Sequence, residues 1–225
     1  MSKPRHINAE FDAELRSLKE QVLAMGSLVD RHVGQAVSAM VERDADRARR
    51  VVEADRAVNQ LELAIDEQCI RVLALHQPAA SDLRFIAAAL KIVTDLERIG
   101  DLAVNMAERV GPLCEEPPLR AVQELPGMAG AAQSMLRDVL EAFVTGDPVK
   151  AEAVMAADAA IDAWMARIFE EVKSAMSRDP NAVARGLATI FFAKHIERMA
   201  DHATNVGEMV IYLVRGQDVR HAKST

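Results

Sequence analysis

The chain has 225 residues, enough for one domain or two small ones, and either can bury a sizeable core. Aromatic residues make up 4% and there are only 10 glycines and 8 prolines, a composition that favours helices over sheets. The 27 basic and 34 acidic residues give a net charge of −7, which disfavours a basic surface for nucleic acid or anionic lipid. The two distant cysteines, Cys69 and Cys114, argue against a disulfide framework or a thiolate zinc site.

No stretch of the sequence is suited to crossing a bilayer. The longest run without a charged residue, 125–136, is well short of the roughly 20 apolar residues that a transmembrane helix needs. The first residues also lack the apolar core of an export signal. We therefore expect a cytoplasmic protein with no direct membrane insertion.

The prolines divide the sequence into helical segments, because proline inside a helix removes a hydrogen bond and clashes with the preceding turn. All eight prolines fall where the apolar periodicity breaks. Asp44, Ser81, Asp147 and Asp179 are candidate N-caps at these breaks. Six helices are predicted, over residues 8–42, 46–75, 80–110, 126–145, 148–176 and 181–215.

The third and sixth predicted helices are copies of one another. In residues 91–110, seven of 20 positions are identical to residues 191–210, at an offset of 100. The second and fifth helices align at an offset of 103, so the chain is a duplicated three-helix unit. We predict an all-α fold of two tandem, sequence-related antiparallel three-helix bundles, with the first over 1–111, a linker over 112–125, the second over 126–216 and a tail over 217–225.

The matched polar positions of the two copies share the pattern E-R-x-x-D-x-x-x-N-x-x-E. At 3.6 residues per turn its acidic and amide side chains follow one stripe, away from the apolar seam. Carboxylates spaced four apart repel one another by about 0.2–0.5 kcal/mol, so such a pair favours a nearby cation. The stripe comprises Glu97, Asp101, Asn105 and Glu108 in the first copy and Glu197, Asp201, Asn205 and Glu208 in the second.

The preceding helix of each half adds two more side chains to each stripe. If the chain reverses at Pro78, Asp55 lies level with Asp101 and Asn59 with Glu97. In an antiparallel helix pair, residues equally distant from the turn lie level with one another. About the turn at Asp179-Pro180, this places Asp158 level with Asp201, and Asp162 level with Glu197. Each half is thus expected to carry a four-residue acidic box.

Carboxylate and amide oxygens suit hard or borderline cations such as Mg²⁺, Mn²⁺ or Fe²⁺. The alternative is a solvated face whose carboxylates pair with Arg98 and Arg198, as surface helices routinely do. Met165 and Phe169 replace Glu62 and Asp66 in the second half, so the first box is expected to hold more charge. No Glu-x-x-His, H-E-x-x-H, Walker-type or G-x-S-x-G motif supports a specific enzyme class.

Three segments carry a resemblance to a known family. Residues 77–84 (Q-P-A-A-S-D-L-R), followed by D-L-E-R-I-G-D at 95–101 and E-R-M-A-D at 197–201, resemble the PhoU family over nearly the whole chain. The resemblance implies that the Glu-x-x-x-Asp pairs bind multinuclear metal clusters, with Fe, Mn, Mg or Zn as candidate ions. The metal-site residues expected from the boxes and the resemblance are Asp55, Asn59, Glu97, Asp101, Asn105, Asp158, Asp162, Glu197, Asp201 and Asn205.

The resemblance also implies a function. PhoU proteins are negative regulators of phosphate uptake that link the phosphate ABC transporter to the sensor histidine kinase of the phosphate-starvation response, usually as homodimers. A metal-binding adaptor without substrate turnover is therefore expected here. A metal-dependent enzyme that activates water in the same boxes, and a metal-free helical scaffold, are the alternatives.

Overall fold

The computed structural model describes residues 9–113, 117–217 and 219, and within them all regular structure is helical. The elements are α1 (Ala9–Glu42), α2 (Ala45–Ala54), α3 (Arg56–His76), α4 (Ala80–Glu108), α5 (Val110–Leu113), the 3₁₀ helix η1 (Arg120–Glu124), α6 (Leu125–Thr145), α7 (Pro148–Arg178), the 3₁₀ helix η2 (Pro180–Ala182) and α8 (Val183–Arg215). Parts of the predicted linker and tail, residues 114–116, 218 and 220–225, lie outside the described residues.

The six predicted helices are confirmed, with one interruption. The segment predicted as a single helix over 46–75 is divided into α2 and α3 at Asp55. Asp44 and Asp147 cap α2 and α7 as expected: Asp44 accepts from the Arg47 N–H at 2.8 Å, and Asp147 from the Val149 N–H at 2.9 Å. The predicted cap at Ser81 is wrong, because the N-cap of α4 is Ala79, two residues earlier, and Ser81 lies inside the first turn of the helix.

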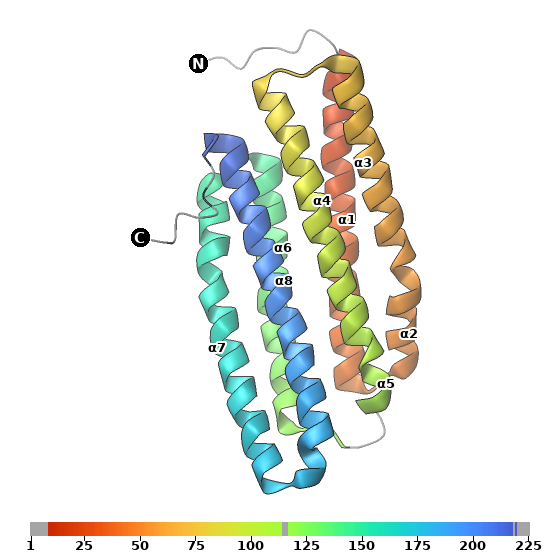
Figure 1. Ribbon diagram of the computed structural model, residues 1–225, viewed down its shortest axis with the longest axis vertical. Coiled ribbons are helices and arrows are strands. Elements are labelled where there is room, and N and C mark those ends of the chain that lie inside the picture. Colours follow the sequence, from red (N-terminus) through yellow and green to blue (C-terminus); the bar gives the residue numbers. More distant parts are fainter. Residues whose placement is uncertain (1–8, 114–116, 218, 220–225) are drawn as a thin grey trace.

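Two three-helix bundles lie side by side (Figure 1). Helix α4 packs against α8 and α1 against α6, while α2–α3 and α7 lie on opposite outer sides. The predicted seam of α4 is buried, and its side chains belong to the same apolar core as those of α6 and α8. The two bundles therefore share one continuous core, which fixes their relative position more firmly than the linker alone would.

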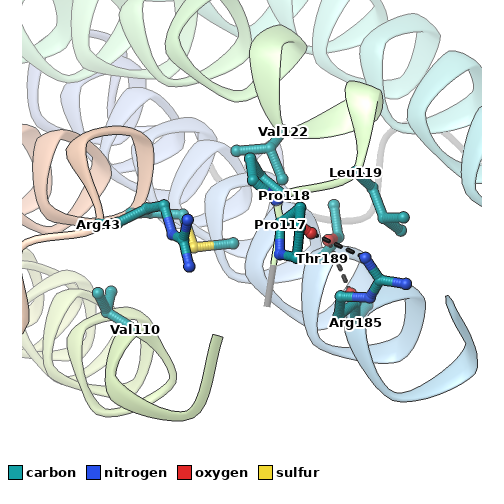
Figure 2. Close-up of a pocket in the computed structure, with 9 residues that line it drawn as sticks. Arg43, Val110, Pro117, Pro118, Leu119, Val122, Arg185 and Thr189 are labelled. Carbon is teal, nitrogen blue, oxygen red and sulfur yellow. Dashed lines mark hydrogen bonds between the residues drawn. The ribbon is translucent and has the colours of Figure 1, made fainter. Parts of the chain in front are cut away.

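The described C-terminal part of the predicted linker, residues 117–125, packs between the bundles. It contains η1, whose Ala121 and Val122 are buried. Figure 2 shows Pro117 and Pro118 between Arg43, at the end of α1, and Arg185 on α8. The Arg185 Nη1 donates to the Pro117 carbonyl at 2.8 Å. The remaining cavity is about 10 Å³, the size of about one water molecule.

The first helix of each bundle ends in the left-handed region. Arg43 has φ 60° and Gly146 has φ 66°, and each is followed by the aspartate that caps the next helix. These positions are related by the offset of 103, so the duplication extends to α1 and α6. A residue with a Cβ is strained at this φ, whereas glycine is not.

Gly146→Ala is therefore expected to lower the free energy of unfolding by about 1 kcal/mol. Gly130→Ala, in the same helix, is the matched control: Gly130 is exposed, and a Cβ there would meet nothing within 4 Å. Because alanine is the better helix former, this change is expected to raise stability by about 0.5–1 kcal/mol. Urea denaturation of both variants measures the difference, and equal effects would contradict the strain assigned to position 146.

Candidate metal centres

The first acidic box lies where the kink between α2 and α3 meets α4. The Asp55 carbonyl accepts from the N–H groups of Val58 at 2.8 Å and Asn59 at 3.2 Å, and its Oδ2 accepts from Asn59 Nδ2 at 3.1 Å. A Cβ on Gly100 would lie 3.2 Å from Val58 Cγ1 and 3.5 Å from Asp55 Oδ1. Glycine at this position thus lets the kink, and the Asp55 carboxylate, approach α4 closely.

Glu97 and Asp101 on α4 lie near this kink and pair with the same basic side chain, that of Arg98. Arg98 Nη1 donates to Asp101 Oδ2 at 2.9 Å, and Arg98 Nε lies 3.4 Å from Glu97 Oε2. Partial burial raises the pKa of Glu97, Asp101 raises it further, and Arg98 opposes both. Because the arginine side chain is more than half exposed, it neutralises only part of the negative charge of the box.

Negative charge in the first box extends onto α3. Partial burial, and then the carboxylate of Asp66, raise the pKa of Glu62, and burial also raises that of Asp66. Partial burial raises the pKa of Asp55 as well; the bond from Asn59 lowers it, and Asp101 raises it again. Among the described residues, Asp55 Oδ1 is buried and has no hydrogen-bond partner. An oxygen-rich, electron-rich donor set of this kind fits a hard or borderline cation.

The second box differs in its backbone and in its counter-ion. Helix α7 continues through Asp158, which is half-buried, without the interruption found at Asp55. Lys194 Nζ contacts Glu197 Oε2 at 2.5 Å. Partial burial, and then Glu197, raise the pKa of Asp201, and Asp162 adds a smaller rise. Glu197, Asp201 and Asp162 are therefore brought together, as the spacing predicted.

Each central helix carries an asparagine one turn beyond its acidic pair. Asn105 is half-buried on α4. Asn205 Nδ2 donates to Asp95 Oδ1 at 3.2 Å, and His202 Nδ1 lies 2.8 Å from the same oxygen. Asp95 belongs to α4, so Asn205 and His202 join the two bundles through their central helices. In this arrangement Asn205 binds the neighbouring bundle rather than the second box.

In each box at least one carboxylate is turned toward a basic side chain: Glu97 and Asp101 toward Arg98, and Glu197 toward Lys194. Within residues 9–113 and 117–217, no three His, Cys, Asp or Glu side chains converge closely enough to ligate one ion as they stand. To bind a metal ion, the carboxylates of these boxes would have to turn away from the basic side chains, Arg98 and Lys194, with which they pair. A metal ion bound in either box would have to displace these ion pairs.

One residue near the first box was missed by the sequence analysis. His32 is only 3% exposed on the core-facing side of α1, and its charge interacts with that of Asp55. Burial lowers the pKa of His32, the Asp55 carboxylate raises it, and Arg31 lowers it. The signal in the sequence is a histidine within the buried stripe formed by Val22, Met25, Val29, His32 and Ala36.

The fold and the two acidic boxes define a duplicated all-helical bundle protein with a negatively charged site on each half. A family model described as the PhoU domain matches residues 22–110 and 125–210. The chain belongs to the PhoU family. The predicted resemblance and fold are thereby confirmed, and the two matched segments correspond to the two predicted bundles.

Relatives and solved structures agree with this assignment. The chain is 44% identical over 221 residues to the phosphate-specific transport system accessory protein PhoU homolog of Pseudomonas putida, covering 98% of this chain and 86% of that protein. It is 36% identical over 217 residues to the phosphate-specific transport system accessory protein PhoU of Escherichia coli, covering 96% and 90%.

The crystal structure of PhoU from Pseudomonas aeruginosa matches with a TM-score of 0.87 at 42% identity, covering 92% of this chain and all of that one. The regulatory protein PhoU from Streptococcus pneumoniae also gives a TM-score of 0.87, at 32% identity, covering 93% of this chain and 99% of that one. These relatives carry the names of accessory and regulatory proteins, and the family is not one of enzymes. The enzyme alternative for the boxes is therefore not retained.

Proposed function

We propose that this chain is a metal-binding regulatory adaptor that represses phosphate uptake and phosphate-starvation signalling. The observation that carries the proposal is the similarity to phosphate-specific transport accessory proteins over both halves and 96–98% of the chain. The adaptor would connect a phosphate ABC transporter with a phosphate-responsive sensor histidine kinase. It would work as a homodimer in the cytoplasm, and without contact with nucleic acid.

Association with the membrane would be indirect in this proposal. Within the described residues, no helix is both long and apolar enough to span a bilayer. Contact with the membrane would therefore come through the transporter and the kinase. The net charge of −7 supports protein partners over a direct lipid surface.

Metal binding would occur in the two acidic boxes. Asp55, Asn59, Glu97 and Asp101 would hold ions in the first, and Asp158, Asp162, Glu197 and Asp201 in the second, with Asn105 and Asn205 on the adjacent turns. The raised pKa values of Asp55, Glu97 and Asp201 support this, because they reflect partly buried negative charge that a cation would neutralise. A divalent or iron-type ion would supply that positive charge and hold the outer helix of each bundle against its central helix.

The regulatory role can be tested in the organism that carries this gene. Deletion is expected to derepress phosphate-starvation genes several-fold in phosphate-rich medium, and the wild-type gene should restore repression. Normal repression in the deletion strain would contradict the adaptor role. Complementation with the Glu97→Gln, Asp101→Asn variant then separates the two parts of the proposal: full repression by a variant without first-box metal would favour the metal-free scaffold.

A further inference from the structure

His32 has the properties of an additional ligand at the first box. In the described part of the chain its Nδ1 atom is buried and has no hydrogen-bond partner, while the whole residue is 3% exposed. A buried polar atom without a partner costs free energy, and native structures seldom leave one unused. Burial favours the neutral imidazole, which is the form that binds metal ions.

The surroundings of His32 point toward the box. Val29 Cγ1, one turn earlier on α1, would lie 3.6 Å from a Cβ on Gly100, and Asp55 Oδ1 would lie 3.5 Å from the same point. The α1 turn before His32, the kink that carries Asp55 and the α4 residue just before Asp101 therefore approach one another at Gly100. His32 lies one turn further along α1, and its charge interacts with that of Asp55. Asp55 Oδ1 and His32 Nδ1 are both buried, and neither has a hydrogen-bond partner among the described residues.

The second bundle lacks an imidazole at the matched position. The offset of 103 that relates Asp44 to Asp147 and Arg43 to Gly146 relates His32 to Met135. Met135 is 3% exposed and so occupies an equally buried place on α6. The matched position of the second bundle thus lacks the nitrogen donor that His32 offers, just as Met165 and Phe169 lack the carboxylates of Glu62 and Asp66.

We propose that His32 contributes a nitrogen ligand, through Nδ1, to the metal ion of the first box. This inference rests on the metal binding proposed above for that box. Imidazole favours iron, zinc and cobalt over magnesium, whereas carboxylate and amide oxygens suit magnesium and manganese. The first site is therefore selective for transition metals. In the second, His202 interacts with Asp201, but its Nδ1 pairs with Asp95, so that site discriminates less.

The test uses the full-length protein with Glu197→Gln and Asp201→Asn, which remove metal binding at the second box. Any metal that this protein binds is then bound by the first box. His32→Met is the main variant, because methionine occupies the matched buried position in the second bundle. His76→Gln is the control: it also removes one imidazole, from a histidine on α3 that pairs with Glu14 at 2.8 Å. Circular dichroism and thermal melting verify that each variant is folded.

Two readouts are expected to change only in His32→Met. Pulsed electron paramagnetic resonance of the Mn²⁺-loaded protein should show coupling to a directly bound ¹⁴N nucleus, which His32→Met abolishes and His76→Gln retains. Affinity for Co²⁺ should fall about 10- to 100-fold in His32→Met, while affinity for Mg²⁺ changes by less than about threefold.

The possible failures are distinguishable. Metal bound by the parent protein without ¹⁴N coupling, and with unchanged Co²⁺ affinity in His32→Met, would overturn the role of His32 and leave the box intact as a metal site. No metal bound by the parent protein under any loading condition would overturn the proposed metal binding, and this ligand with it.

Discussion

Replacing Glu97 by Gln and Asp101 by Asn is expected to remove the metal bound by the first bundle and to weaken its affinity for divalent ions at least 100-fold. Both side chains lose the negative charge that an ion would neutralise, yet keep their size and their ability to accept hydrogen bonds. Elemental analysis of the purified protein measures the loss, with the wild type and the quadruple variant that also carries Glu197→Gln and Asp201→Asn analysed beside it.

The matched control removes two carboxylates elsewhere on a helix surface. Asp138 and Glu141 on α6 contact Lys150 at 3.3 Å and 2.5 Å, away from either box. The variant Asp138→Asn, Glu141→Gln changes the net charge by the same amount and should keep its metal. Equal metal content in all variants, or none in the folded wild type, would show that the boxes are ion-pair surfaces and would leave regulation to the helix surfaces alone.

Leu96→Ala is expected to lower the free energy of unfolding by about 2–5 kcal/mol, the usual result of emptying a fully buried leucine site. Leu96 has 0% exposure on α4, the helix that packs against α1 and α3 in its own bundle and against α8 in the other. For a chain of this length such a loss lowers the melting temperature by about 5–15 °C. Because the two bundles share a core, the whole chain should unfold in one earlier transition.

Leu63→Ala is the control for that experiment. Leu63 lies on the outer side of α3 with 62% of its surface exposed, so its truncation should change stability by less than about 0.5 kcal/mol. Differential scanning calorimetry compares the two variants. Two separate transitions in Leu96→Ala, with the second bundle melting as in the wild type, would contradict a shared core.

Much of the candidate site could be predicted because the relevant residues are close in sequence or related by a tight turn. Asp55 and Asp101 were placed level across the turn at Pro78, and in the structure the charge of Asp101 raises the pKa of Asp55. The kink at Asp55 could not be predicted. Residues 46–75 have continuous helical periodicity, whereas in the structure the interruption lies against Gly100 on another helix.

The contacts between the bundles could not be predicted from the sequence either. Asp95 and His202 occupy matched faces of the two central helices, but no pattern indicates that they meet at 2.8 Å. Arg109 and His195 meet in the same way, with the Arg109 Nε donating to His195 Nε2 at 3.4 Å. Burial, and then the charge of Arg109, lower the pKa of His195 to about 4, so it stays neutral as a structural partner at neutral pH.

The sequence by itself predicted the helices, apart from the break at Asp55, their duplication and the apolar seam of α4, and it grouped four polar positions in each half as a candidate box. These follow from a period of 3.6 residues, from proline and capping residues, and from repeat offsets, all of which act along the chain. Only the tertiary structure decided that α4 packs on α8, that Asn205 bonds Asp95, and that His32 lies buried beside Asp55. The reason is physical: periodicity specifies which face of a helix is apolar, whereas the partner of that face is selected by shape and charge over the whole folded core.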